Sequence, residues 1–215
     1  GGMVATAVNL SPLPPEVFDA IGPYVHACKM MGSMASQILG HTPKSLKVEL
    51  AGGLADADPA PLLAAVLDGG LSYRRLGAFS AANAESVASQ HGISVTTASV
   101  RDAGEYASSV RIVADEVEVA ATLFGTEHTP RIISLMGYKI DIAPATTSLV
   151  FEYVDAPGRI GVIGTILGEA AANITTMQIG TKPEESCALV YMNVEGDVSE
   201  AVLDRLRGAI DLRNL

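Results

Sequence analysis

The sequence predicts an α+β protein built of two parts, and three observations indicate this class. Residues 1–143 mix helical periodicity with strand-like alternation, which predicts a domain that contains helices and strands together. Residues 144–215 show the order βαββαβ, with turn residues between neighbouring elements. Apolar residues make up 48% of the chain and charged residues 18%, so the chain has enough apolar side chains to bury a sizeable core.

Charge and hydropathy exclude several classes of partner. The chain has 14 basic and 24 acidic residues and a formal net charge of −10, with no run of lysine and arginine. Such a chain repels nucleic acid and anionic lipid, and no apolar stretch approaches the roughly 18 residues that span a bilayer. Cys28 and Cys187 lie far apart in apolar surroundings, which favours two buried thiols and a cytoplasmic protein. We therefore expect neither a nucleic acid nor a membrane partner.

The first part begins with a long predicted helix. The Pro-Pro-Glu sequence that starts at Pro14 suits a first turn, and the helix is expected over residues 14–39, ending at Gly40. Its apolar positions are Val17, Ile21, Val25, Met30, Met34 and Ile38. Residues 45–50 alternate apolar and charged side chains, which predicts a strand with one exposed face.

Two short helices and a series of strands follow. Residues 61–71 predict one helix and residues 80–90 another, with Ser80 as its N-cap and an end at His91. The β-prone segments beyond them are residues 93–100, 107–113, 116–124, 131–136 and 139–142. The first part is therefore expected to extend to about Ala143 as a mixed α/β domain.

The second part shows a clearer pattern. Residues 148–154 alternate as a strand, Asp155 is expected to cap the helix at residues 158–168, and Pro157 is expected in its first turn. The apolar stripe of that helix is Ile160, Ile163, Ile166, Leu167 and Ala170. The remaining elements are strands at 173–179 and 187–194, a helix at 198–207 and a short strand at 210–212. This βαββαβ order specifies a ferredoxin-like sandwich, an antiparallel sheet with two helices on one face.

The second part also resembles the ACT domain signature. The similarity lies in Phe-Glu-Tyr-Val-Asp-Ala-Pro-Gly-Arg-Ile-Gly at 151–161, Gly-Thr-Ile-Leu-Gly at 164–168 and Ala-Asn-Ile at 172–174. The resemblance implies an amino-acid-binding domain whose ligand, L-serine or a similar small amino acid, is bound where two such domains meet. The residues that fall on the family's ligand positions are Tyr153, Asp155, Pro157, Gly158, Gly161 and Asn173.

The chemistry of these residues suits such a ligand. The Pro-Gly turn leaves the amides at the start of the helix open to a carboxylate, and Gly158 and Gly161 let a ligand approach the backbone. Asp155 can pair with an ammonium group and Asn173 with a hydroxyl. The alternative is that Asp155 only caps the helix and Asn173 only begins a strand.

The preceding part resembles the intervening domain of the long bacterial phosphoglycerate dehydrogenases. The similarity rests on Ala-Thr-Ala-Val-Asn at 5–9 and Gly-Tyr-Lys-Ile-Asp at 137–141. It implies an intervening domain at 1–143 and an ACT domain at 144–215, the regulatory part of an NAD-dependent enzyme of serine biosynthesis that forms homo-oligomers. The NAD-binding and catalytic domains would then lie outside this chain, so we expect neither a catalytic residue nor a cofactor within it.

The resemblance implies a second, anionic site, because the intervening domain of this family can hold a phosphorylated substrate among basic side chains. Arg131 and Lys139 fall in the right region, whereas Ala143 and Asn193 stand where arginines are expected. A pocket with two cations is weaker than one with three or four. Further candidate cations are Arg74, Arg75, Arg101 and Arg111, although scattered arginines are more often surface charges.

Other chemistries find no support in the sequence. The four histidines lie far apart and neither cysteine belongs to a Cys-x-x-Cys pair, so no metal site is expected. Ser80 and Ser99 have no histidine and acid partners at a plausible spacing, which argues against nucleophilic catalysis. Two alternatives to the serine-sensing reading remain: the regulatory domain of an L-serine dehydratase-like enzyme, and a purely structural oligomerisation module.

Overall fold

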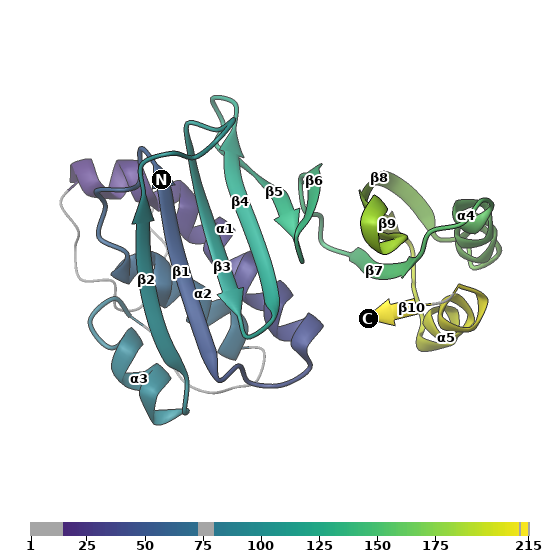
Figure 1. The fold of residues 1–215 in the computed structure, drawn as a ribbon, viewed down its shortest axis with the longest axis horizontal. Helices are drawn as coiled ribbons and strands as arrows, with labels where there is room; N and C mark the ends of the chain where they lie inside the picture. Colours follow the sequence, from purple (N-terminus) through teal and green to yellow (C-terminus); the bar gives the residue numbers. More distant parts are fainter. Residues whose placement is uncertain (1–14, 73–79, 211, 215) are drawn as a thin grey trace, which may run out of the picture. The chain divides into compact units, whose positions relative to one another are not determined.

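A computed structural model of the chain describes residues 15–72, 80–210 and 212–214, which divide into two compact units between Arg131 and Ile132 (Figure 1). Among the described residues, no helix combines the length and the apolar character needed to cross a membrane. The predicted α+β class is confirmed, because both units combine helices with a sheet.

In the first unit, the described residues form three helices and four strands that precede the unit boundary. These elements are α1 (Pro15–Leu39), β1 (Ser45–Gly52), α2 (Ala60–Ser72), α3 (Ala84–Gln90), β2 (Ser94–Val100), β3 (Ser108–Ala114) and β4 (Val117–Phe124). They belong to a six-stranded sheet of order β2-β1-β3-β4-β5-β6, where β5 is Thr129–Leu135 and β6 is Tyr138–Ile142. Strand β1 pairs in parallel with β2 and antiparallel with β3. Every predicted strand of the first part is present, with ends shifted by at most two residues.

One face of this sheet forms the core of the first unit. Leu46, Val48 and Leu50 of β1 are at most 3% exposed, as the alternating pattern predicts. Helices α1 and α2 cover one face of the sheet (Figure 1). The opposite face of β1 carries Lys47 and Glu49, whose side chains form an ion pair of 2.8 Å. The period of two therefore separates the core face from a charged face.

Small residues, and not the predicted large apolar positions, bring α1 against α2. The side chains of Ala27, Cys28 and Ala35 are almost fully buried. Of the predicted stripe, Ile21 is buried, whereas Val25, Met30, Met34 and Ile38 are only half-buried, and the side chain of Val17 lies outside the described part of the chain. The two backbones approach so closely that a Cβ added to Gly69 would lie 1.9 Å from the carbonyl oxygen of Lys29. Glycine and alanine are required here because a larger side chain would separate the helices.

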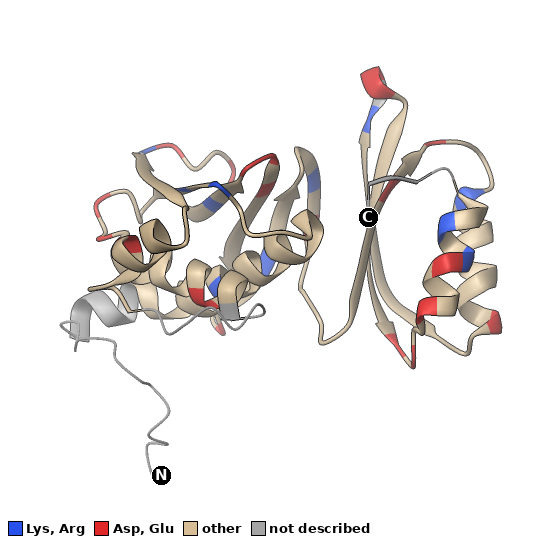
Figure 2. Cartoon of the chain, turned by 90° about the horizontal axis from the view of Figure 1, so that it is seen from below, with Lys and Arg blue, Asp and Glu red and all other residues tan. Residues whose placement is uncertain are grey.

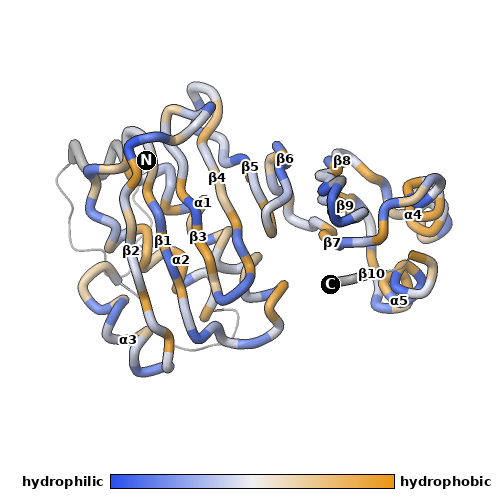
Figure 3. The backbone as a smooth tube through the Cα atoms, viewed as in Figure 1, coloured by the Kyte–Doolittle hydropathy of each residue, from blue (hydrophilic) through white to orange (hydrophobic). Residues whose placement is uncertain are grey.

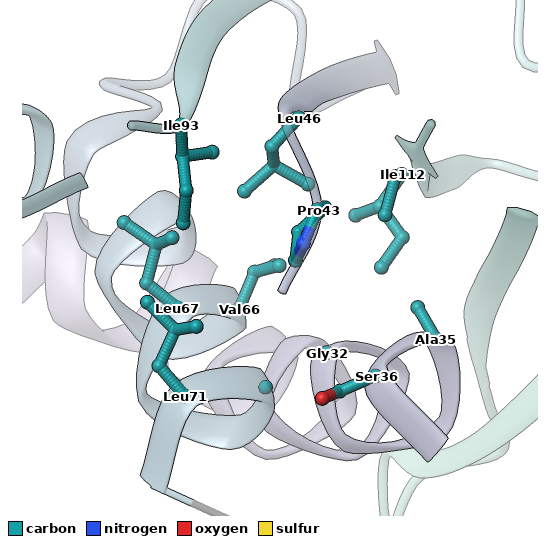
Figure 4. Close-up of a pocket in the computed structure, with 12 residues that line it drawn as sticks. Gly32, Ala35, Ser36, Pro43, Leu46, Val66, Leu67, Leu71, Ile93 and Ile112 are labelled. Atoms are coloured by element: carbon teal, nitrogen blue, oxygen red, sulfur yellow. The ribbon is translucent and has the colours of Figure 1, made fainter. Parts of the chain in front are cut away.

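A small apolar cavity lies at the edge of this packing (Figure 4). It encloses about 20 Å³ among residues from both helices and the sheet, including Ala35, Leu46, Val66, Leu67, Ile93 and Ile112. This volume is room for about one water molecule, and its lining offers few polar partners. The cavity is therefore a packing feature of the core and not a ligand site.

The second unit contains a four-stranded antiparallel sheet with two helices. Its further elements are β7 (Ser148–Val154), α4 (Arg159–Glu169), β8 (Asn173–Lys182), the 3₁₀ turn η1 (Pro183–Glu185), β9 (Cys187–Glu195), α5 (Glu200–Ala209) and β10 (Leu212–Asn214). The strand order is β10-β7-β9-β8 with antiparallel neighbours throughout. This order is the one that a ferredoxin-like βαββαβ unit requires, and the predicted fold is confirmed.

The two faces of this sheet are covered by different elements. On one face, Phe151, Tyr153 and Val190 pack with Ile163 and Leu167 of α4 in a single apolar cluster, which confirms the predicted stripe of that helix. On the other face, β6 lies across β8 and β9. A Cβ added to Gly180 of β8 would lie 2.9 Å from the Cβ of Tyr138 in β6, so this position must be glycine for the strand to fit. The central strand β9 is thus buried on both faces, whereas the edge strand β8 is largely exposed.

Three local predictions about helix starts and domain limits need comment. Ser80 does not cap α3; the helix begins at Ala84, and Ser80 instead opens a turn in which its amide donates to Oδ1 of Asn83 at 2.7 Å. The predicted start at Pro14 lies outside the described residues. The predicted domain boundary between residues 143 and 144 stays a prediction, while the contacts place the division between compact units earlier, after Arg131.

Candidate functional site

A groove lies where β7 ends and α4 begins. It has a volume of about 440 Å³ and is lined by Tyr153, Asp155, Ala156, Pro157, Gly158, Arg159, Ile160 and Gly161. Five of the six residues predicted to bind an amino acid are therefore next to one another in this groove, and Asn173 is not among them. Its remaining lining residues, Ala156, Arg159 and Ile160, were not predicted, although their places in the turn and the first helical turn are visible in the sequence.

The start of α4 leaves backbone donors open to the groove. Gly158 is the N-cap with φ of 91°, a left-handed conformation that glycine adopts without strain, and no side chain caps the helix. The amide of Val162 donates to the carbonyl of Gly158, whereas the amides of Ile160 and Gly161 find no acceptor among the described residues. Two open N–H groups and the positive end of the helix dipole make this end a place for an anionic group such as a carboxylate.

Asp155 does not play the capping role predicted for it. Its side chain makes no cap hydrogen bond, and Pro157 precedes the N-cap instead of lying in the first turn of α4. The Asp155 amide donates to the carbonyl of Ser186 at 3.0 Å, which fixes the end of β7 against the turn before β9. The exposed carboxylate of Asp155 remains at the groove, where it can pair with a cation.

The groove contains a buried, uncharged hydroxyl and one positively charged side chain. Tyr153 is 1% exposed, and burial together with the charge of Asp155 raises its pKa, so its hydroxyl stays neutral. Arg159 is the one basic residue in the lining, and its Nη1 donates to the carbonyl of Ala209 at 3.3 Å. Arg159 therefore ties the start of α4 to the end of α5 while adding positive charge beside the open amides.

Asn173 lies at the other end of α4 from the groove. It begins β8, four residues after α4 ends at Glu169, and its side chain is exposed. A helix of 11 residues is about 16 Å long, so Asn173 of the same chain cannot reach a small ligand at the helix start. Strand β8 is the outermost strand of its sheet, and no strand in the described part of the chain pairs with its outer side.

The two residues predicted to hold a phosphate belong to different units. Arg131, at the end of the first unit, has its Cζ 5.6 Å from the ring centroid of Phe124, and Lys139 is an exposed residue of β6. Of the additional candidates, Arg101 pairs with Asp56 at 3.1 Å, and Arg111 lies 3.3 Å from Glu118. Arg74 and Arg75 lie outside the described residues, and the anion site stays a prediction.

Ala143 and Asn193 meet through a structural contact. Nδ2 of the buried Asn193 donates to the carbonyl of Ala143 at 2.8 Å, and its Oδ1 accepts from Oγ of Ser148 at the same distance. The side chain that stands in place of an expected arginine therefore holds the segment between β6 and β7 against the sheet.

A second polar cluster lies beside the η1 turn. This turn is acidic and follows the basic end of β8 (Figure 2). Glu152, Glu185 and Cys187 offer atoms within 4.8 Å of one another, a proximity that sequence spacing did not reveal. Nζ of Lys182 already lies 3.9 Å from Glu185, and the Tyr138 hydroxyl donates to Glu152. Because a lysine and a tyrosine serve these carboxylates, the cluster supports no metal proposal, and the expected lack of a metal stays a prediction.

Both cysteines are buried thiols, as predicted. Cys28 is fully buried in α1, and burial raises the pKa of its thiol to about 12. Cys187 is 1% exposed, and its Sγ donates to the carbonyl of Glu185. The Cys28 thiol is therefore unreactive at neutral pH, because its thiolate is not formed.

Comparison with known proteins identifies the family to which this chain belongs. The chain combines a mixed α/β unit with a ferredoxin-like unit that carries a groove, so it is an α+β protein of two units. The sequence model of the D-3-phosphoglycerate dehydrogenase intervening domain matches residues 20–136. The chain therefore belongs to the D-3-phosphoglycerate dehydrogenase intervening domain family.

Relatives align over nearly all of the chain. It is 24% identical over 217 residues to D-3-phosphoglycerate dehydrogenase of Methanocaldococcus jannaschii, covering 100% of the chain and 41% of that relative. It is 27% identical over 220 residues to the enzyme of that name from Mycobacterium tuberculosis, with the same two coverages. For the Bacillus subtilis protein of that name, identity is 26% over 212 residues, covering 97% of the chain and 40% of the relative. The chain thus spans about two fifths of the length of these relatives.

Proposed function

We propose that the chain is the regulatory part of a D-3-phosphoglycerate dehydrogenase of serine biosynthesis, which binds L-serine or a similar small amino acid through an ACT domain and mediates homo-oligomerisation. The family membership and the names of the relatives support the parent activity. The parent enzyme would use NAD, bound outside this chain. The feedback signal would then be the amino acid at the end of the pathway.

The groove at the start of α4 is the observation that carries this proposal. A free amino acid is a zwitterion, and the groove offers one group for each of its charges. The open amides of Ile160 and Gly161 receive the carboxylate, and the carboxylate of Asp155 receives the ammonium. Of the predicted ligand residues, Gly158 and Gly161 have open space where a side chain would stand, so a small ligand meets no obstruction at the backbone.

A second copy of the chain completes the site. Asn173 lies about one helix length from the groove of its own chain, at an exposed edge strand. A two-fold axis beside β8 would set the two α4 helices antiparallel and bring Asn173 of the second copy to the groove of the first. The outward side of α4 supports such an approach, because Gly161, Gly164 and Gly168 have open space at their Cβ positions. Ligand binding and assembly are then linked, since each site needs both copies.

Two other readings differ in what they expect of the groove. The regulatory domain of an L-serine dehydratase-like enzyme would have the same groove but would belong to a different enzyme. A purely structural oligomerisation module would leave the groove empty. The family match favours the dehydrogenase over the dehydratase, and the open amides favour a binding site over a structural surface.

Calorimetric titration of the chain tests the proposal. L-serine should bind saturably, glycine should bind more weakly because it lacks the hydroxyl for Asn173, and D-serine should not bind with the same affinity. Titration with 3-phosphoglycerate tests the predicted anion site at Arg131 and Lys139 separately. Silence with every small amino acid over a millimolar range would leave the structural reading in its place.

A further inference from the structure

Strand β2 ends the six-stranded sheet with an unpaired edge. It pairs with β1 over seven residues, from Ser94 opposite Ser45 to Val100 opposite Ala51. No strand among the described residues pairs with its outer side. The N–H and C=O groups along such an edge form a template for another strand.

The composition of β2 lacks the features that usually protect an edge. Its sequence is Ser-Val-Thr-Thr-Ala-Ser-Val, without charge, proline or glycine, and four of its seven residues are β-branched. Proteins commonly place charged residues or proline on exposed edge strands to prevent pairing. The strand at the other end of this sheet, β6, follows this rule, since it contains Lys139 and Asp141. In Figure 3, β2 runs in pale and orange tones.

The apolar face of the sheet continues onto β2, where α3 contacts the strand but leaves much of it exposed. Leu46 and Val48 of β1 are at most 3% exposed, whereas their partners on β2, Val95 and Thr97, are half-buried and exposed respectively. Val100, at the end of the strand, is 38% exposed. Pairing at this edge would bury side chains on both faces of β2 in addition to satisfying its backbone.

We propose that β2 is the surface through which the first units of two copies associate, by antiparallel pairing of β2 with β2 about a two-fold axis. A two-fold axis makes identical edges antiparallel and self-complementary. With the axis at Thr97, this residue faces its own copy and Val95 faces Ser99 of the second chain, so no charge is opposed. In a chain of net charge −10, an uncharged strand is where two copies meet without like-charge repulsion. This inference rests on the proposed self-association and names its surface in the first unit, independently of the amino-acid groove.

A cysteine placed at the axis tests the geometry directly. Residues directly opposite in an antiparallel pair have Cα atoms about 4.5 to 5.5 Å apart, which is within disulfide range. Thr97→Cys in the full chain should therefore form a disulfide-linked dimer with oxidised glutathione, as seen on non-reducing gels. Thr126→Cys, at an exposed position in the turn after β4, is the matched control and should stay unlinked. The native Cys28 and Cys187 are buried and do not compete.

A charge at the same position supplies a second readout. Thr97→Lys should weaken the association measured by sedimentation velocity about tenfold or more, because two ammonium groups would be opposed at the axis. Thr126→Lys should leave it unchanged, and circular dichroism checks that both variants are folded. Unlinked Thr97→Cys together with unchanged association of Thr97→Lys would overturn the β2 surface. If L-serine still binds in those variants, the amino-acid site stands although the β2 surface fails. If the wild-type chain binds no amino acid but Thr97→Cys crosslinks, the β2 surface stands although the amino-acid site fails.

Discussion

The hydroxyl of Tyr138 donates a 2.5 Å hydrogen bond to Oε1 of Glu152, and both side chains are buried in the second unit. Tyr138 belongs to β6 and Glu152 to β7, so the bond joins the covering strand to the sheet face that carries no helix. The ammonium of Lys182 lies 4.2 Å from the centre of the tyrosine ring and adds a cation–π contact. This contact explains why residues before 144 pack as part of the second unit.

Removing the Tyr138 hydroxyl should destabilise the chain. Tyr138→Phe removes one hydrogen-bond donor from a buried carboxylate, which costs about 1 to 3 kcal/mol in the free energy of unfolding. Glu152→Gln keeps an acceptor at the same place and should cost less. Urea denaturation at neutral pH measures both. Equal stability of Tyr138→Phe and the wild type would show that the hydrogen bond contributes nothing.

The same bond predicts a pH dependence. Burial is the main cause that raises the pKa of Tyr138, and the hydrogen bond to Glu152 and its charge add to it. A raised folded-state pKa means that the stabilisation is complete below the unfolded-state pKa of about 10 and is lost as the pH rises above it. The stability difference between the wild type and Tyr138→Phe should thus shrink above pH 10. A difference that is constant from neutral pH to pH 11 would contradict the assignment.

The close contact between α1 and α2 predicts that glycine-to-alanine substitutions destabilise the chain at some positions and not at others. Gly69→Ala would place a Cβ 1.9 Å from the carbonyl oxygen of Lys29, so the helices must separate. We expect a loss of about 3 kcal/mol in unfolding free energy. Gly208→Ala in α5 meets nothing within 4 Å and should be neutral or slightly stabilising. Thermal melting of the two variants provides the comparison, and similar melting temperatures would argue against the close crossing.

The two buried hydrogen bonds of Asn193 predict that its substitution lowers the stability of the chain. Asn193→Ala would leave the carbonyl of Ala143 and the hydroxyl of Ser148 without their buried partner. The cost should be about 1 to 3 kcal/mol. Asn193→Asp removes the donor to Ala143 but keeps the acceptor for Ser148, so it separates the two bonds. Chemical denaturation gives the magnitudes, and an Asn193→Ala variant as stable as the wild type would make the network dispensable.

Local patterns in the sequence predicted most of the fold. The period of two at Leu46, Val48 and Leu50 and the stripe at Ile163 and Leu167 each reflect one element and its own burial. In the predicted stripe of α1, Ile21 is buried as expected, but four other positions are only half-buried, because a close helix crossing selects Ala27 and other small residues, which carry little hydropathy signal. The placement of β6 across the second sheet depends on a contact between distant segments, which no local pattern contains.

The candidate site could be predicted where its residues lie close together in the sequence. Tyr153, Asp155 and Gly158 are close in sequence, so their proximity in the groove follows from one turn. Asp155 was assigned a cap because its residue type favours that role, but Gly158 takes the N-cap position. Asn173 shows the limit of such reasoning, since residue type and resemblance indicate a ligand role while one chain alone does not bring it to the groove.

Complementation between two defective variants tests the central claim most directly. Asp155→Ala removes the ammonium partner and Asn173→Ala the group supplied by the second copy, so neither variant alone should bind L-serine in calorimetric titration. In a mixed dimer, one site carries both substitutions and the other carries none. After exchange of copies, an equimolar mixture should therefore recover about one quarter of the wild-type stoichiometry at wild-type affinity. A mixture as silent as its components, beside a wild-type chain that binds, would contradict a site shared between two copies, and a silent wild-type chain would contradict the amino-acid site itself.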